Sequence, residues 1–135
     1  MASITTARTS EYSDIDFMFS ANPNIENDIA IKRESAAIRQ SVLNILRTNH
    51  GEKPFRPYFG ANLTAYLFEN IDQITAQSMS ASIRNAITND EPRVNILNIE
   101  IRANPDTNAI NITVTVQLIS TLESIDIQTN LERLR

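Results

Sequence analysis

The spacing of apolar residues changes once along this chain, and that change restricts the folds it can adopt. Before Pro92 the apolar residues recur at helical intervals, whereas from Val94 onward they alternate with polar residues. A repeat of about 3.6 residues is typical of an amphipathic helix, and a repeat of two is typical of a strand with one buried face. Helices followed by strands predict an α+β domain with helices packed on one face of a small, mainly antiparallel sheet.

The helical part of the pattern predicts three helices, over residues 34–48, 62–70 and 75–89. In the first, Ile38, Val42 and Ile45 share one face. Asn62 is a suitable N-cap for the second helix, because its side chain can accept a hydrogen bond from an unpaired backbone N–H. Pro92 disfavours helical backbone at the residue before it, and therefore bounds the third helix.

The alternating part predicts three strands, over residues 94–101, 110–118 and 125–131. In the first strand the alternation slips by one residue near Leu97, which a β-bulge would explain. The segment 104–108 combines Pro, Asp and Asn and predicts a turn between the first two strands. Ile125, Ile127 and Thr129 continue the alternation near the C-terminus, so the last strand should also have one buried face.

A length of 135 residues suits a single domain, for which we expect an extended N-terminal arm over 1–28 and the folded part over 29–135. The arm shows little periodicity apart from the apolar trio Phe17, Met18 and Phe19. We expect this trio to form a short strand that docks on the chain's own domain or on a partner.

Composition excludes several functions. The 12 Lys and Arg residues against 16 Asp and Glu residues give a net charge of −4, which disfavours nonspecific nucleic-acid binding, and the few lysines cannot form a polybasic membrane patch. No apolar run is long enough for a membrane span, and the polar start is unlike a signal peptide, so we expect a protein made and kept in a cytoplasm. With no Cys, one His and two Gly, thiolate metal sites and glycine-rich phosphate loops are ruled out, and no cofactor is expected.

Candidate catalytic groups are few. His50 follows the first helix, where a cation would favour the helix macrodipole, so a capping role is favoured over catalysis. Carboxylate pairs that could serve a glycosidase are Glu11 with Asp14 or Asp16, and Glu52 with Glu69. Such an enzyme needs its two carboxyl groups at set separations across a sugar cleft, and the chain has no Trp to line one. A small glycan-cleaving enzyme is therefore kept as the alternative function.

The segment 50–60 holds both glycines, two of the five prolines and three of the eight aromatic residues. One interpretation is a rigid loop in which Phe55, Tyr58 and Phe59 fill the gap between two helices. The other is a partner-binding surface, because aromatic residues and Arg concentrate binding energy at interfaces. Its candidate partner-binding residues are Lys53, Phe55, Arg56 and Tyr58.

The third helix passes into the first strand at Glu91, Pro92 and Arg93. Pro92 rigidifies this connection, and Arg93 offers a planar fork for a carboxylate or for backbone carbonyls. An ordinary helix stop with solvated charges would explain the same residues.

Four short motifs occur in an order and spacing that match a known family. They are residues 12–17 (YSDIDF), 51–60 (GEKPFRPYFG), 67–70 (LFEN) and 91–94 (EPRV). In these motifs the chain resembles the baseplate wedge or sheath-initiator proteins of contractile-tailed bacteriophages, a family labelled lysozyme-like and related to type VI secretion baseplate subunits. The resemblance covers about residues 12–132.

This resemblance implies a structural, non-enzymatic role in the virion. Family members sit in the sixfold baseplate, bind other wedge subunits and start polymerisation of the tail sheath, and contacts with tail tube or hub proteins are also implied. Glu91, Pro92 and Arg93 are implied to contact a helical bundle formed by neighbouring wedge subunits. The resemblance implies no catalytic residue, metal or cofactor.

The resemblance also implies a sheet edge to which sheath subunits add strands. The sequence agrees, because no Lys occurs between Val94 and Arg133, and exposed strand edges are usually protected by Lys, Pro or inward charges. The alternative is a central strand that is already paired on both sides. Candidate partner-binding residues of this edge are Ile125, Ile127, Gln128 and Thr129.

Overall fold

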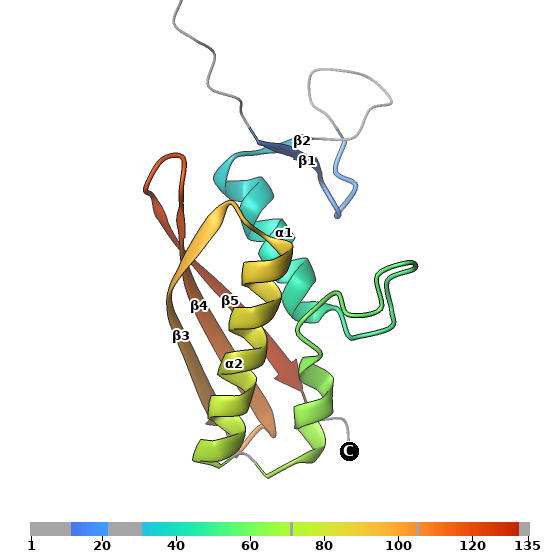
Figure 1. Cartoon of the computed structure of the whole chain (residues 1–135), viewed down its shortest axis with the longest axis vertical. Coiled ribbons are helices and arrows are strands. Elements are labelled where there is room, and N and C mark those ends of the chain that lie inside the picture. The colour runs from blue at the N-terminus through green and yellow to red at the C-terminus, as the bar shows by residue number, and fades with distance from the viewer. Residues whose placement is uncertain (1–11, 22–30, 71, 105, 133–135) are drawn as a thin grey trace, which may run out of the picture. The chain divides into compact units, whose positions relative to one another are not determined.

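The structure, a computed structural model, describes residues 12–21, 31–70, 72–104 and 106–132. Its elements, most of them labelled in Figure 1, are β1 (Ser13–Ile15), β2 (Ile31–Arg33), α1 (Ser35–Arg47), the 3-10 helix η1 (Leu63–Phe68), α2 (Gln73–Asp90), β3 (Val94–Asn104), β4 (Ala109–Leu118) and β5 (Ser124–Glu132). The chain divides into two compact units, one ending at Ile38 and the other starting at Arg39. The boundary expected between an arm and a folded domain at residue 28 stays a prediction.

The first unit contains a small antiparallel hairpin of β1 and β2. The prediction of a strand at Phe17–Phe19 is wrong, because Phe17 and Met18 form a turn. Asp16 holds this turn: its carbonyl accepts a hydrogen bond from the Phe19 N–H (2.9 Å) and its carboxylate accepts one from the Met18 N–H (3.1 Å). Asp favours turns because its side chain can bond backbone groups two residues on. The remainder of the expected arm lies outside the described residues.

The second unit contains a three-stranded antiparallel sheet in the order β3-β4-β5. The register of β3 on β4 shifts between Ile96 and Asn98, which confirms the bulge expected near Leu97. In the turn that follows β3, the Asp106 N–H donates to the side chain of Asn104 (3.1 Å), as expected for an Asn-based turn. The predicted α+β class is confirmed.

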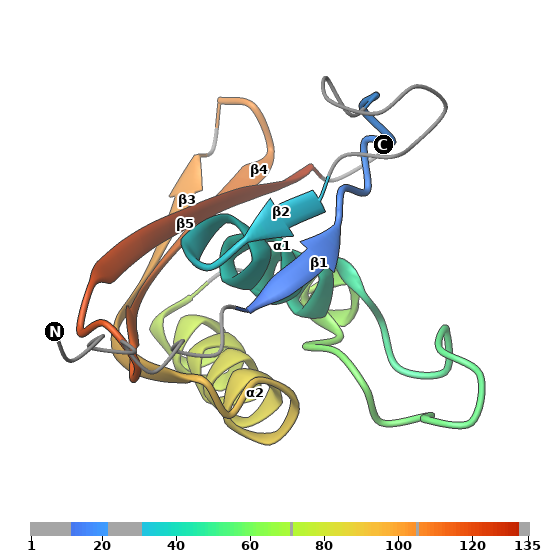
Figure 2. The same ribbon diagram turned by 90° about the horizontal axis from the view of Figure 1, so that it is seen from above.

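The core of the second unit lies between the helices and one face of this sheet (Figures 1 and 2). Alternate residues of β4 and β5 are buried there, as their period of two predicts, and so are residues of α2 at helical spacing. Fully buried side chains include Val42, Ile45, Met79, Ile83, Ile87, Ile110, Ile112, Val114, Val116 and Ile127. The intervening residues of β5 are exposed, so the opposite face of the sheet is wet.

The helices begin and end close to the predicted residues. α2 starts two residues early because the Asp72 carboxylate caps it by accepting a hydrogen bond from the Thr75 N–H (2.8 Å). It ends at Asp90, before Pro92, as predicted. Asn62 occupies the N-cap position of η1, as predicted, but its backbone is left-handed (φ 50°) and its side chain does not make the expected cap hydrogen bond. Asn tolerates this conformation better than most residues other than Gly.

Thr129 offers a test of the core. Its hydroxyl is buried and, within the described part of the chain, has no hydrogen-bond partner. Replacing it with Val keeps the shape and removes the unsatisfied group, so we expect Thr129→Val to raise the free energy of unfolding by about 1 kcal/mol in urea titrations. Thr113→Val, at a half-exposed position of β4, is the matched control and should change little. A destabilised Thr129→Val would contradict the inference that the hydroxyl is unsatisfied.

Candidate partner-binding surfaces

One edge of the sheet is formed by β5, which within the described residues pairs with β4 alone. In an antiparallel pair, residues that bond to each other alternate with residues whose N–H and C=O groups point away from the partner strand. The Leu118 N–H donates to the Glu123 carbonyl (2.9 Å), so these two residues form a bonded pair and fix the alternation along β5. The residues whose backbone groups face the open edge are Ser124, Asp126, Gln128 and Asn130.

Among the described strands β5 is not central, which is against the alternative of a strand paired on both sides, and the structure separates the four residues expected at this edge. The side chains of Ile125, Ile127 and Thr129 are buried, and by the same alternation their backbone groups point to β4. Gln128 has an exposed side chain, and its N–H and C=O face outward. Of the four, Gln128 is therefore the residue that a partner strand can reach directly.

The opposite edge, formed by β3, is less regular. The shift between Ile96 and Asn98 interrupts its ladder, and the stronger twist at a bulge discourages the pairing of a further strand. β5 pairs over nine residues without a shift. The edge on β5 is therefore the better acceptor for a strand.

A buried ion pair joins the end of α2 to the start of β3. The Glu91 side chain is 2% exposed, and Arg93 donates to both of its carboxylate oxygens, through Nε (2.5 Å) and Nη2 (2.6 Å). Ser41 of α1 donates a third bond, from Oγ to Oε2 of Glu91 (2.5 Å). The interpretation of these residues as solvated charges at a helix stop is therefore wrong. Nothing in the spacing of the sequence indicated Ser41.

These donors decide the charge of Glu91. Burial by itself would raise its pKa, but the hydrogen bonds from Arg93 and Ser41, together with the positive charge of Arg93, hold the pKa below its usual value. The ionised carboxylate thus ties α1, α2 and β3 together. Pro92 is exposed and the Arg93 side chain is 30% exposed, so these two residues, and not Glu91, can reach a partner.

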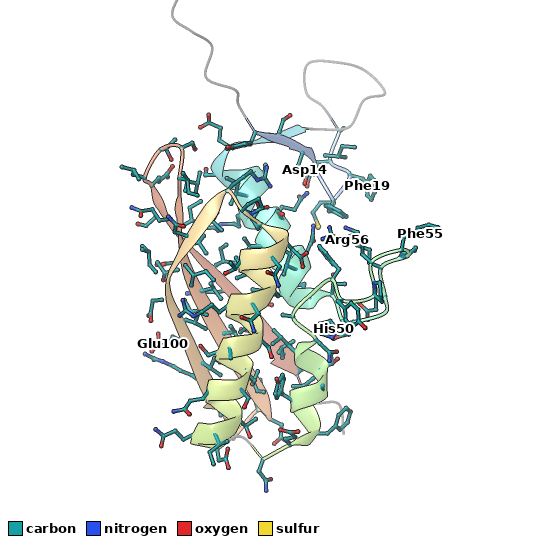
Figure 3. All side chains as sticks on the ribbon, viewed as in Figure 1. Asp14, Phe19, His50, Phe55, Arg56 and Glu100 are labelled. Atoms are coloured by element: carbon teal, nitrogen blue, oxygen red, sulfur yellow. The ribbon has the colours of Figure 1, made fainter. Side chains whose placement is uncertain are left out.

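The loop between α1 and η1, residues 50–60, presents aromatic side chains to solvent, and we call it the aromatic loop. Phe55 is fully exposed and Tyr58 is 85% exposed, so the interpretation in which they fill a gap between helices is wrong for both. Figure 3 shows Phe55 at the tip of this loop, directed away from the helices. Phe59 is half-buried, and its ring lies 4.0 Å from the Lys53 ammonium and 5.3 Å from the Arg56 guanidinium.

Several contacts fix the base of the aromatic loop. Gly60 has a φ of 98°, and a Cβ at this position would lie 2.2 Å from the Thr48 carbonyl oxygen, so glycine is required. The Arg56 guanidinium forms an ion pair with Asp90 (2.9 Å). His50 Nε2 lies 3.1 Å from the Gly60 carbonyl oxygen, so the ring links the two ends of the loop, and the expected helix-capping role stays a prediction. The aromatic residues are therefore displayed on an anchored scaffold.

The carboxylates near the aromatic loop bear on the glycosidase alternative. A cleft of about 330 Å³ lies beside the aromatic loop, but Asp90 is the one acidic residue among those lining it, and it is paired with Arg56. Hydrogen bonds from Asn49 lower the pKa of Glu52, opposite to the shift that a general acid needs. Glu11 lies outside the described residues. Among the described residues, no group of three potential metal ligands occurs. No helix among them is long and apolar enough to cross a membrane.

These features define the class: a small α+β domain with an open strand edge and an exposed aromatic loop. Three solved structures have a similar fold. A candidate tail lysozyme from Geobacter sulfurreducens gives a TM-score of 0.66 at 22% identity, over 73% of this chain and 89% of that one. A chain of the anti-feeding prophage baseplate gives a TM-score of 0.63 at 17% identity, over 93% of this chain and 88% of that one. A chain of the postcontracted pyocin R2 baseplate gives a TM-score of 0.58 at 16% identity, over 90% of this chain and 98% of that one.

Sequence comparison identifies the family. Residues 32–123 match the family described as baseplate wedge protein gp25. Baseplate wedge protein gp25 of Enterobacteria phage T4 is 34% identical over 92 residues, which span 67% of this chain and 67% of that protein. The chain therefore belongs to the family of baseplate wedge protein gp25, which confirms the family that its motifs resemble. The matched residues include three of the four motifs and not residues 12–17.

The buried ion pair predicts a large effect of Arg93 on stability. Removing one partner of a buried pair commonly costs about 3–5 kcal/mol, and the partial exposure of Arg93 reduces this, so we expect Arg93→Ala to lower the free energy of unfolding by about 2 kcal/mol. Denaturant unfolding measures this change. Arg102→Ala, which breaks the exposed pair of Arg102 with Glu100 on the wet face of β3, is the matched control and should cost less than about 0.5 kcal/mol. Equal effects of the two substitutions would contradict a structural role of Arg93.

The lowered pKa of Glu91 predicts a dependence of stability on pH. A carboxyl whose pKa is lower in the folded chain than in the unfolded chain stabilises the fold above its usual value near 4.5, and this stabilisation is lost as the pH falls through the folded pKa. We expect the gap in melting temperature between the native chain and Glu91→Gln to be largest near pH 7 and to shrink below the usual pKa. A gap that stays constant down to pH 3 would show that the charge of Glu91 contributes nothing.

Proposed function

We propose that the edge of β5 in this baseplate wedge component receives strands from the first tail sheath subunits and so templates sheath assembly. The observation that carries this proposal is the row of backbone groups that faces outward from Ser124 to Asn130. An added strand can bond to this row without disturbing the pairing of β5 with β4, because the two sets of backbone groups point in opposite directions. The uninterrupted register of β5 favours this edge over that of β3.

The chain also associates with other baseplate subunits, as its family membership implies. For these contacts the proposal assigns the aromatic loop, with Lys53, Phe55, Arg56 and Tyr58, since exposed aromatic and basic side chains on an anchored loop suit an interface. Exposed Pro92 and the accessible part of Arg93 form a second contact for neighbouring wedge subunits, while Glu91 positions Arg93 from the core.

The resulting location is the tail baseplate of the virion, reached by assembly in the host cytoplasm, where tail tube or hub proteins are further candidate neighbours. The proposal assigns no enzymatic activity. A glycan-cleaving enzyme would need two suitably spaced carboxyl groups, one of them with a raised pKa, whereas the cleft beside the aromatic loop offers Asp90 alone, in an ion pair. The Geobacter protein described as a candidate tail lysozyme shares the fold at 22% identity, and a shared fold alone does not transfer an activity.

The test replaces the outward N–H at the centre of the edge. Gln128→Pro removes this donor, and proline is tolerated in an edge strand where the N–H faces solvent, so we expect a folded chain whose pairing with β4 persists. Baseplates containing this variant should form, whereas sheath growth from them should stop, because an added strand would lose a bond and meet the proline ring. Electron micrographs of assembled tails give the readout.

Two controls separate the edge from the fold. Gln128→Ala keeps the N–H and should give normally sheathed tails. Ile127→Pro removes an N–H that points to β4, so it should lower the melting temperature sharply. This variant is the reference for a folding defect. Normal sheaths on Gln128→Pro tails would contradict the proposal and assign sheath attachment to another surface.

A further inference from the structure

One residue of the open edge of β5 is bonded by a basic side chain of α1. The Arg39 guanidinium donates to the carbonyl of Asp126, one of the residues whose backbone faces outward (3.1 Å). Leu43 and Arg47 follow Arg39 at intervals of four residues, and Figures 1 and 2 both draw this helix beside β5. Arg39 and Arg47 are exposed, and Leu43 is half-buried. We propose that this row selects a partner strand with acidic side chains at alternate positions, an inference that rests on strand addition at the edge.

The spacing of the row fits a strand. Residues four apart on a helix are separated by about 6 Å along its axis, since each residue rises about 1.5 Å. Side chains on one face of a strand repeat every second residue, at about 6.6–6.8 Å. A strand added to β5 in line with α1 would carry three alternate side chains at the spacing of Arg39, Leu43 and Arg47. The matching pattern is acidic, apolar, acidic at positions i, i+2 and i+4.

The hydrogen bond of Arg39 explains why the match should be selective. An incoming strand needs the Asp126 carbonyl as an acceptor for one of its own N–H groups, so it must displace the guanidinium. The displaced cation then needs a new acceptor, because a charged donor left unsatisfied at an interface is costly. A carboxylate on the new strand provides that acceptor in a geometry that a guanidinium binds well. A Gln side chain in its place is a weaker acceptor, and a Lys side chain repels the guanidinium.

The wet face of β5 restricts where the added strand can carry acidic side chains. Asp126 and Glu132 carry their exposed side chains on this face, and the Asp126 carboxylate accepts a bond from the Thr115 hydroxyl (2.7 Å). Acidic side chains of the added strand on this face would meet like charge. The selected strand therefore carries its acids on the helix side and uncharged residues in between, which discriminates against uniformly acidic segments.

Three blocked seven-residue peptides test this inference: Thr-Glu-Thr-Val-Thr-Glu-Thr and the same peptide with Gln or Lys in place of both Glu residues. Binding to the full chain is followed by NMR titration of the β5 amide signals. We expect the Glu peptide to bind about tenfold more tightly than the Gln peptide, and the Lys peptide to bind least. Arg39→Glu should reverse this order, while Arg84→Glu on the exposed face of α2 should leave it unchanged.

The outcomes distinguish this inference from the proposed function. Equal binding of the Glu and Gln peptides, a preference that survives in Arg39→Glu, or no saturable binding of any peptide would overturn it. Loss of Glu-peptide binding in Gln128→Pro supports it, because that variant removes the edge donor alone. A mixed result separates the two conclusions: the preference for the Glu peptide holds, but the native chain and Gln128→Pro capture purified tail sheath protein equally well. That result supports the selectivity of the edge and contradicts the sheath-templating function.

Discussion

The register of β5 on β4 is the constraint on which the rest of the molecule depends. One bonded pair, Leu118 with Glu123, decides which residues of β5 turn their side chains to the core and which turn their backbone groups to the open edge. A slip of one residue would expose Ile125 and Ile127 and bury Asp126 and Gln128, so the apolar pattern specifies the register strongly. The register of β5 therefore both buries its core side chains and orients the backbone groups of the candidate binding edge.

The ion pair of Glu91 and Arg93 keeps the helices in place behind that sheet. Because Ser41 of α1 shares the carboxylate, the pair connects α1 to the junction of α2 and β3, which lies 50 residues further along the sequence. Its burial means that Glu91 acts through Arg93 rather than by touching a partner. The Glu91 side chain is thus structural in its contacts, whereas Pro92 is exposed and the Arg93 side chain is 30% exposed, and our proposal assigns these two residues to contacts with neighbouring subunits.

The spacing of apolar residues was sufficient to predict secondary structure where a single periodicity ran through a segment. The bounds of α1, the C-terminal end of α2, the bulge near Leu97 and the alternation of β4 and β5 all follow from spacing and proline chemistry, which act over a few residues. Spacing failed in short polar or aromatic segments. The apolar trio at Phe17–Phe19 forms a turn because Asp16 bonds its backbone, and Phe55 and Tyr58 are exposed although aromatic residues are commonly buried.

The sequence by itself determined the order of helices and strands from α1 to β5, the core residues of these elements and the family of the chain, because periodicity and motifs are properties of neighbouring residues. It did not predict β1 or β2. Only the tertiary structure decided that β5 lies at an edge, that Glu91 is buried against Ser41, and that Arg39 reaches the Asp126 carbonyl. Each of these depends on which distant segments pack together. Hydrogen-bond partners separated by 50 or 87 residues leave no signal in the spacing of either one.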